Sequence, residues 1–266
     1  MKKAAIIYYS ASGNTEKVSG WLRQDIIKKG LSVSSYTIPE IRGCLPQDVH
    51  EADIIFIGTP TYMWHTPKIV KDFLRSIELK KGTPVGLFVT FGSVTVGSNI
   101  SSMAGTVRKK GGRVVGAMQI EGEHAMMFKG DAPLAQGKPG PEDRRAVKEF
   151  ADLCLERAAK PGCSLKKFPN VMKHFSFLCP PSIAMRFMPG IKHSMETCTL
   201  CGACVESCPV NNIVIDEGIL RHGSECLYCY NCVRVCPTGA VDANLISMEG
   251  GLRMMSRLPE KERALY

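Results

Sequence analysis

The sequence lacks any hydrophobic run long enough to cross a membrane. Its longest apolar stretches, such as residues 54–57, are far shorter than the roughly 18 to 20 residues that span a bilayer. It also lacks the uninterrupted apolar segment of a signal peptide, which is broken by Ser10, Ser12, Asn14 and Glu16. We therefore expect a cytoplasmic protein without membrane association.

Apolar residues are not scarce, as they are in disordered chains. Hydrophobic residues make up 44% of the sequence and charged residues 22%, which describes an ordinary globular protein. The 266 residues exceed what one small core needs. The length therefore predicts one domain of about 150 residues together with a smaller one.

The cysteines lack the distribution of a secreted disulfide scaffold. Eight of the 12 cysteines lie between Cys198 and Cys236. The remaining cysteines are scattered, and we expect them to be ordinary core or surface residues: Cys44, Cys154, Cys163 and Cys179.

Acidic residues are absent from residues 160–194, which hold six lysines and arginines and several prolines. The next segment, 195–243, has two arginines against six acidic residues. Basic residues without acidic neighbours are thus concentrated in a Pro-rich connector rather than arranged into a binding face, so we expect no nucleic-acid partner. Two interpretations of this connector stay open: its apolar side chains pack against the domains, or it docks on a partner or a membrane surface.

The first 160 residues alternate between short apolar β-branched runs and helical patterns. The predicted strands are 4–9, 31–37, 53–58, 84–90 and 113–120, and the predicted helices are 15–29, 68–77, 99–110 and 142–159. Five strands joined by crossovers predict an α/β fold with a parallel sheet covered on both faces. Ligands of such sheets bind beyond the carboxyl ends of the strands, which directs attention to loops 10–15, 58–67 and 90–98.

A run of four cysteines followed by proline occurs twice, 28 residues apart: Cys198, Cys201, Cys204 and Cys208, then Cys226, Cys229, Cys232 and Cys236. Zinc is the alternative metal. Zinc sites use two pairs of cysteines per ion, however, so this spacing favours two 4Fe-4S clusters. Residues 192–244 resemble bacterial two-cluster ferredoxins. The resemblance implies a small α+β domain with a hairpin between its halves.

In such ferredoxins the fourth cysteine of each run binds the other cluster. The resemblance therefore implies that cluster I is held by Cys198, Cys201, Cys204 and Cys236, and cluster II by Cys226, Cys229, Cys232 and Cys208. The second run has Tyr230 where the first has Gly202. Tyr228 and Tyr230 either shield cluster II from water or are ordinary packing residues.

Hydroxyl groups and a glycine follow the first predicted strand and open a helix, as in a phosphate-binding loop: Ser10, Ser12, Gly13, Asn14 and Thr15. The lysine of a nucleoside triphosphate loop is missing, which favours a terminal monophosphate. This loop resembles the FMN phosphate loop of flavodoxins. The resemblance implies a doubly wound, flavodoxin-like five-stranded sheet.

The second and third loops lie where flavodoxins enclose the flavin ring, so the resemblance implies that they bind FMN through Thr59, Pro60, Thr61, Tyr62, Trp64, Thr90, Phe91 and Gly92. Either Tyr62 or Trp64 stacks on the ring. His65 is a weaker candidate, as a proton donor. No catalytic residue is assigned.

These loops depart from carrier flavodoxins in two ways. Neither the second nor the third loop contains Asp or Glu, and Met63 replaces the glycine expected after the stacking aromatic. We expect a less negative second reduction potential and weaker stabilisation of the one-electron-reduced flavin. Residues 121–140 form either a lid over the flavin or a surface loop.

The whole chain resembles flavodoxin-ferredoxin fusion proteins of anaerobes. The implied division is 1–160 for the FMN domain, 161–191 for the connector, 192–244 for the ferredoxin domain and 245–266 for a tail. The resemblance implies electron transfer between the clusters and FMN, linking a low-potential donor to a partner protein. The alternative is an FMN-dependent reductase of a small organic substrate. Direct use of NAD(P)H is not expected, because a Gly-x-Gly-x-x-Gly motif is missing.

Overall fold

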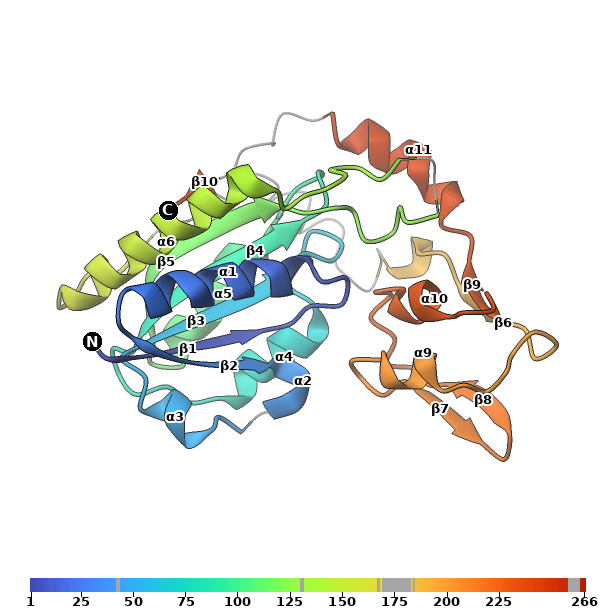
Figure 1. Ribbon diagram of the computed structural model, residues 1–266, viewed down its shortest axis with the longest axis horizontal. Coiled ribbons are helices and arrows are strands. Elements are labelled where there is room, and N and C mark those ends of the chain that lie inside the picture. Colours follow the sequence, from blue (N-terminus) through green and yellow to red (C-terminus); the bar gives the residue numbers. More distant parts are fainter. Residues whose placement is uncertain (42–43, 130–131, 167, 169–182, 184, 258–263) are drawn as a thin grey trace.

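Five parallel strands form the sheet of the N-terminal part in the computed structural model (Figure 1). The structure describes residues 1–41, 44–129, 132–166, 168, 183, 185–257 and 264–266. The strands are β1 (Lys3–Tyr8), β2 (Ser32–Thr37), β3 (Ile54–Pro60), β4 (Pro84–Phe91) and β5 (Arg113–Glu121). Their order, β5-β4-β3-β1-β2, is the order that a flavodoxin-like sheet requires. All five predicted strands are confirmed.

Helices cover both faces of this sheet. The predicted helices appear as α1 (Asn14–Lys28), α4 (Lys68–Ser76), α5 (Asn99–Lys109) and α6 (Pro141–Ala159), and two short helices were not predicted, α2 (Ile38–Ile41) and α3 (Gln47–His50). Side chains alternate between the two faces along each strand. Ile6 and Phe56 therefore pack with α1 and α6, whereas Ile7 and Ile57 pack with α4 and α5.

The C-terminal part repeats its backbone conformation at the spacing of the cysteine runs. Its elements are β6 (Ile191–His193), α9 (Ala203–Glu206), β7 (Ile213–Asp216), β8 (Ile219–His222), α10 (Asn231–Val235) and β9 (Val241–Ala243). Leu200 and Tyr228 have φ values of 54° and 52°, and Gly202 and Tyr230 have φ values of 81° and 55°. Each half thus contains a tight cysteine loop of the same backbone conformation. The predicted hairpin is present as β7 and β8.

The chain returns to the sheet after the second half. Helix α11 (Ile246–Met255) follows β9, and a short strand, β10 (Ala264–Leu265), pairs antiparallel with β5 as a sixth strand (Figure 1). The backbones of Ala117 and Tyr266 exchange two hydrogen bonds of 2.9 and 3.1 Å. The last residues of the tail are therefore attached to the edge of the sheet at β5.

Most of the Pro-rich connector lies outside the described residues, so both interpretations of it remain predictions. A short 3-10 helix, η1 (Met185–Phe187), precedes β6. Within the described part of the chain, no helix is both long enough and apolar enough to span a membrane. The cytoplasmic location stays a prediction.

Candidate functional site: a cavity between the sheet and the cysteine-rich region

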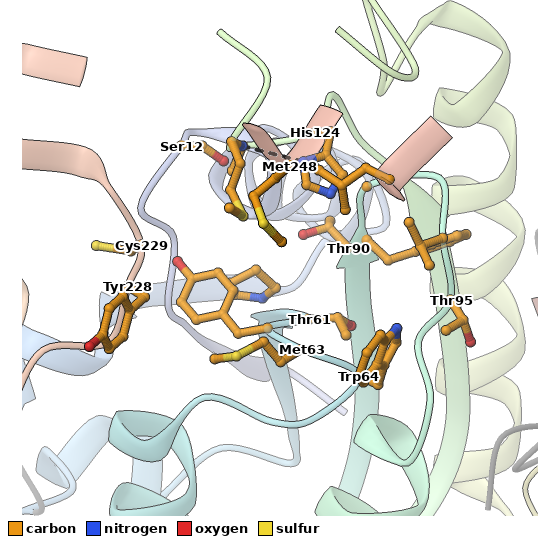
Figure 2. A pocket seen from close by; sticks show the side chains of 18 of the residues that line it. Ser12, Thr61, Met63, Trp64, Thr90, Thr95, His124, Tyr228, Cys229 and Met248 are labelled. Atoms are coloured by element: carbon orange, nitrogen blue, oxygen red, sulfur yellow. Dashed lines mark hydrogen bonds between the residues drawn. The ribbon is translucent and has the colours of Figure 1, made fainter. Parts of the chain in front are cut away.

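A cavity of about 350 Å³ lies beyond the carboxyl ends of the central strands. Most of the predicted flavin-binding residues line it: Ser12, Asn14, Pro60, Thr61, Tyr62, Trp64, Thr90, Phe91 and Gly92. Figure 2 shows Tyr228 and Cys229 on one side of the cavity and Trp64 and Thr95 on the other. The cavity is therefore shared by the sheet and the cysteine-rich region.

The first loop ends β1 and opens α1. Gly13 precedes α1 with a φ of 89°, a left-handed conformation that favours glycine. The hydroxyl of Ser10 is buried and has no hydrogen-bond partner. The hydroxyl groups of Thr15 and Thr90 are hydrogen-bonded at 2.7 Å, which joins the first loop to the third. A buried hydroxyl without a partner, next to a helix N-terminus, fits a bound phosphate group.

The second loop is a tight two-residue turn. The backbones of Tyr62 and His65 exchange hydrogen bonds of 3.0 and 2.9 Å, and Met63 and Trp64 between them have φ values of 47° and 63°. The sequence predicts that Met63 would resist a positive φ, yet it already has one, because closing this turn requires positive φ at both central residues. The expected effect on flavin reduction stays a prediction.

Neighbouring residues hold this turn in place. The amide of Asn99 donates to the carbonyl oxygen of Pro60 at 3.1 Å and to the hydroxyl of Thr61 at 3.0 Å. A Cβ atom at Gly97 would lie 2.3 Å from the carbonyl oxygen of Trp64. The side chain of His65 is hydrogen-bonded to Ser98 at 3.0 Å and is not part of the cavity lining.

Residues 123–126 line the cavity, so this part of the predicted segment 121–140 forms a lid rather than a free surface loop. The amide of Asn14 donates to the carbonyl oxygen of Glu123 at 2.8 Å. A Cβ atom at Gly92 would lie 2.6 Å from the ring of His124. Burial lowers the pKa of His124 to about 4, and its Nδ1 accepts a hydrogen bond from the backbone of Met126 at 3.3 Å. His124 is therefore a neutral side chain at pH 7.

This lid also brings charge to the cavity. Neither predicted flavin loop is acidic, but Glu123 of the lid lines the cavity. Arg234 of α10 donates to the carbonyl oxygen of Ala125 at 2.7 Å and lies over the ring of Phe128 at 4.5 Å. The guanidinium group thereby attaches the lid to the cysteine-rich region.

Sequence reasoning missed the residues that close the cavity from the C-terminal side. These residues are Phe187, Met188, Tyr228, Cys229, Met248, Leu252 and Met255. Helix α11, which supplies three of them, contains Gly250 and Gly251, so its sequence favours a helix only weakly. Tyr228 and Cys229 were singled out for the clusters, and nothing in their sequence positions points to the flavin loops.

The cysteines gather around two smaller cavities. One is lined by Cys208, Cys226, Cys229 and Cys232, and the other by Cys198, Cys201, Cys204 and Cys236. Cys208 thus lies with the second run and Cys236 with the first. Tyr230 also lines the first of these cavities and is only 1% exposed, so it helps to exclude water there.

Backbone N–H groups point at the sulfur atoms. Asn212 donates to Cys208 at 3.2 Å, Tyr228 to Cys226 at 3.3 Å and Val241 to Cys236 at 3.4 Å. Four thiols around each cavity, with amide donors to sulfur, fit an iron-sulfur cluster. Among the described residues, no three His, Cys, Asp or Glu side chains are arranged to share a single metal ion.

Comparison with known families favours 4Fe-4S clusters over zinc for the two cysteine runs. The flavodoxin domain family matches residues 5–124, and the 4Fe-4S dicluster domain family matches residues 197–240. The chain is a flavodoxin-ferredoxin fusion. The flavodoxin domain implies FMN and the ferredoxin domain implies 4Fe-4S clusters, so the protein transfers electrons by means of FMN and iron-sulfur.

Solved structures resemble the flavodoxin domain. A short-chain flavodoxin associated with a bacterial microcompartment is 19% identical, covers 60% of this chain and 100% of its own, and has a TM-score of 0.46. Flavodoxin 2 from Bacillus cereus is 20% identical, covers 58% of this chain and 98% of its own, and has a TM-score of 0.46. Megasphaera elsdenii flavodoxin is 21% identical, covers 57% of this chain and 98% of its own, and has a TM-score of 0.43. No curated protein matches the fusion chain.

Four of the residues predicted to bind FMN are not part of the cavity lining. Three of them belong to the first loop. Ser10 has the buried hydroxyl, Gly13 has the left-handed conformation before α1, and Thr15 is hydrogen-bonded to Thr90. Thr59 is fully buried, and its hydroxyl donates to the carbonyl oxygen of Pro60 at 3.0 Å.

Proposed function

We propose that the protein transfers electrons within one chain between two 4Fe-4S clusters and FMN, and links a low-potential donor to a partner protein. The observation that carries the proposal is the position of Cys229, which lines both the flavin cavity and the cavity of the second cysteine group. A cluster passes one electron at a time, whereas FMN accepts one or two. The protein would thereby connect one-electron and two-electron chemistry.

The ligand sets in this proposal are the crossed ones. Cluster I would be held by Cys198, Cys201, Cys204 and Cys236, and cluster II by Cys208, Cys226, Cys229 and Cys232. The two groups of thiols around separate cavities support this assignment. The side chain of Cys201 is exposed, whereas Cys229 faces the flavin cavity. Cluster I would therefore exchange electrons with outside partners, and cluster II with the flavin.

The first loop would hold the FMN phosphate through Ser10, Ser12, Gly13, Asn14 and Thr15. The ring would lie between the second and third loops. Figure 2 shows Trp64 at the far side of the cavity from Cys229, whereas the ring of Tyr62 packs edge-on against Tyr9 at 6.1 Å. We assign the ring contact toward cluster II to Tyr62 and the opposite one to Trp64.

The division of the chain stays as the sequence predicts it: residues 1–160 bind FMN, 161–191 connect, 192–244 hold the clusters and 245–266 form the tail. The tail would add a cover to the flavin. Support comes from Met248, Leu252 and Met255 of α11, which line the flavin cavity.

A second candidate function is a reductase of a small organic substrate. The apolar cover formed by Met126, Met188 and the three α11 side chains favours it, because such a cavity suits an apolar molecule. Electrons would then enter through the clusters and leave at the flavin. Consumption of a substrate by the reduced protein, at a rate matching flavin reoxidation, would favour this candidate over transfer to a partner protein.

The test uses a protein donor that is too large to enter the covered cavity. Purified holoprotein is mixed anaerobically with a reduced two-cluster bacterial ferredoxin, and flavin bleaching is followed by stopped-flow absorbance. Cys208→Ser removes a ligand of cluster II without touching the flavin cavity, and Cys44→Ser replaces an exposed thiol as control. We expect at least a tenfold slower bleaching in Cys208→Ser and no change in Cys44→Ser. Equal rates in all three proteins would contradict the proposal.

A further inference from the structure

His124 belongs to the lid, and its side chain lines the flavin cavity. The ring packs against the third flavin loop, because a Cβ atom at Gly92 would lie only 2.6 Å from its Cδ2 atom. Figure 2 shows His124 on the same side of the cavity as Met248, across from Met63 of the second loop. The lid thus places one polar ring in the wall of the cavity.

Hydrogen bonds fix the backbone on both sides of this histidine. Asn14 of the first loop donates to the carbonyl oxygen of Glu123 at 2.8 Å. Arg234 of the ferredoxin domain donates to the carbonyl oxygen of Ala125 at 2.7 Å. The backbone N–H of the histidine itself donates to the carbonyl oxygen of Leu134 at 3.0 Å. The position of the ring is therefore set before a ligand enters the cavity.

The hydrogen bond of the ring determines which of its nitrogens carries the proton. The backbone N–H of Met126 lies 3.3 Å from Nδ1 of His124. A backbone N–H can only donate, so Nδ1 accepts. Because burial lowers the pKa of His124 to about 4, the ring is neutral at pH 7 and has a single N–H group. That N–H group is therefore at Nε2.

The Nε2–H group of His124 is directed at the cavity and not at the protein. Among the described residues, none forms a hydrogen bond with Nε2, and this nitrogen is not one of the fully enclosed polar atoms that lack a partner. Other polar groups of the cavity are already hydrogen-bonded within the protein. The hydroxyl of Thr90 is bonded to Thr15 at 2.7 Å, and that of Thr61 accepts from Asn99 at 3.0 Å. His124 therefore offers an unused donor to a molecule in the cavity.

We propose that the Nε2–H group of His124 donates a hydrogen bond to the flavin ring of FMN and thereby favours the fully reduced flavin. The inference rests on the proposed function, in which this cavity binds FMN between the second and third loops. Reduction makes the acceptor atoms of the flavin ring richer in electrons, so a hydrogen-bond donor stabilises the reduced flavin more than the oxidised flavin. The lid would thus hold the ring and also tune its potential.

Two amide side chains separate this role from a merely structural one. Asparagine places its carbonyl oxygen near the position of Nδ1, so His124→Asn keeps the acceptor for Met126 and loses the donor to the cavity. Glutamine is one carbon longer and places its NH2 group near the position of Nε2, so His124→Gln keeps the donor and loses the acceptor. A flavin-binding role and a structural role therefore predict opposite orders for the two variants.

The experiment measures FMN affinity and the two-electron potential of the flavin in the full chain, at equal iron contents. For His124→Asn we expect about fivefold weaker binding of oxidised FMN. Its equilibrium constant for two-electron reduction should fall about tenfold, which is about 30 mV. His124→Gln should stay close to the unchanged protein, as should His50→Asn in α3, which precedes β3 and so lies away from the carboxyl ends of the strands. Equal losses in His124→Asn and His124→Gln, or a greater loss in His124→Gln, would overturn the inference.

The two readouts also cover a variant that loses its flavin. If His124→Asn holds no FMN, retention of FMN by His124→Gln supports the inference and its loss overturns it. Flavin bleaching by reduced ferredoxin is measured separately, so the inference and the proposed function can fail independently. Slow bleaching of an unchanged protein that binds FMN would contradict only the proposed function, whereas an unchanged affinity and potential in His124→Asn would contradict only the inference.

Discussion

Ser10 of the first loop and His124 of the flavin cavity both bury a polar group. Ser10 buries a hydroxyl without a partner, and His124 holds a ring whose pKa burial has lowered to about 4. The Ser10 hydroxyl weakens the fold slightly, since a buried polar group without a partner costs about 1–3 kcal/mol, and His124 opposes protonation of its ring. Such costs are typical of residues that serve a ligand.

The Ser10→Ala variant should separate binding from stability. We expect about tenfold weaker FMN binding to the flavin-free protein, because one hydrogen bond to a charged phosphate contributes about 1.5 kcal/mol or more. The flavin-free variant should be as stable as the unchanged protein or more stable, since the unsatisfied hydroxyl is gone. Fluorescence titration and thermal unfolding measure the two effects, and Ser35→Ala, on the exposed side of β2, is the control. A loss of stability without a loss of affinity would contradict the assignment.

His124 should make the flavin-free protein sensitive to acid. Its folded pKa of about 4 lies below the ordinary value of about 6.5, so the unfolded chain takes up the proton first as the pH falls. The free energy of unfolding should therefore decrease between pH 6.5 and pH 5, by up to about 2 kcal/mol. In His124→Asn, which keeps an acceptor for Met126, anaerobic thermal unfolding should show a flatter dependence on pH. An equally steep dependence would mean that other groups cause it.

At the scale of elements, the cavity is closed by short segments whose sequences have no strong helix or strand pattern. The turn between Tyr62 and His65 is held by its own hydrogen bonds and by Asn99. The lid is fastened by Asn14 on one side and by Arg234 on the other. Helix α11 contributes one apolar face to the cavity, and its Arg253 donates to the carbonyl oxygen of Ala132. Each element is stabilised by what it contacts rather than by its own propensity.

Helix α11 should slow the release of FMN. Leu252 lines the cavity, whereas Met254 on the same helix is 68% exposed. Leu252→Ser should remove about 1 kcal/mol of apolar burial and speed FMN release about fivefold. Met254→Ser should leave the release rate unchanged. Release can be followed by the recovery of flavin fluorescence after dilution, and equal rates for the two variants would show that α11 does not act as a cover.

At the scale of the whole molecule, contacts between distant segments bring the cofactor sites together. Arg234 reaches Ala125, Lys129 pairs with Asp242, and Arg253 donates to the carbonyl oxygen of Ala132 at 2.7 Å. The side chains of Lys68 and Glu225 form a further ion pair at 3.3 Å, but they are 66% and 63% exposed. The Arg234 contact is partly buried, so it should matter more than the exposed ones.

Arg234 should therefore govern electron transfer between the domains. Arg234→Gln loses a hydrogen bond from a charged group, worth about 1.5–3 kcal/mol, and the contact with Phe128. We expect flavin bleaching by reduced ferredoxin to become about tenfold slower, with iron and FMN contents unchanged. Lys68→Gln should slow bleaching less than about twofold, because exposed ion pairs contribute little. Equal effects of the two substitutions would argue against a special role for Arg234.

Much of the fold could be predicted because its signals are local. Apolar runs such as 54–57 form strands by their own pattern, and the predicted strand and helix limits lie close to the observed ones. Strand β10 and helix α11 could not be predicted in this way, since a two-residue strand and a helix with two glycines have weak patterns. The lid was predicted only as one of two alternatives, because its contacts with Asn14 and Arg234 span more than 100 residues.

The sequence by itself determined the chemistry that the protein can hold. The spacing of its two cysteine runs and the hydroxyl-rich loop after the first strand indicate 4Fe-4S clusters and FMN, because ligand spacing within a short loop depends on few residues. Only the tertiary structure decided how these sites meet. Cys229 lines the same cavity as the flavin loops, and Leu227 beside it packs into a core formed by residues far away in the chain. Apolar packing of this kind has no short sequence motif, since it is set by the shape of the whole interface.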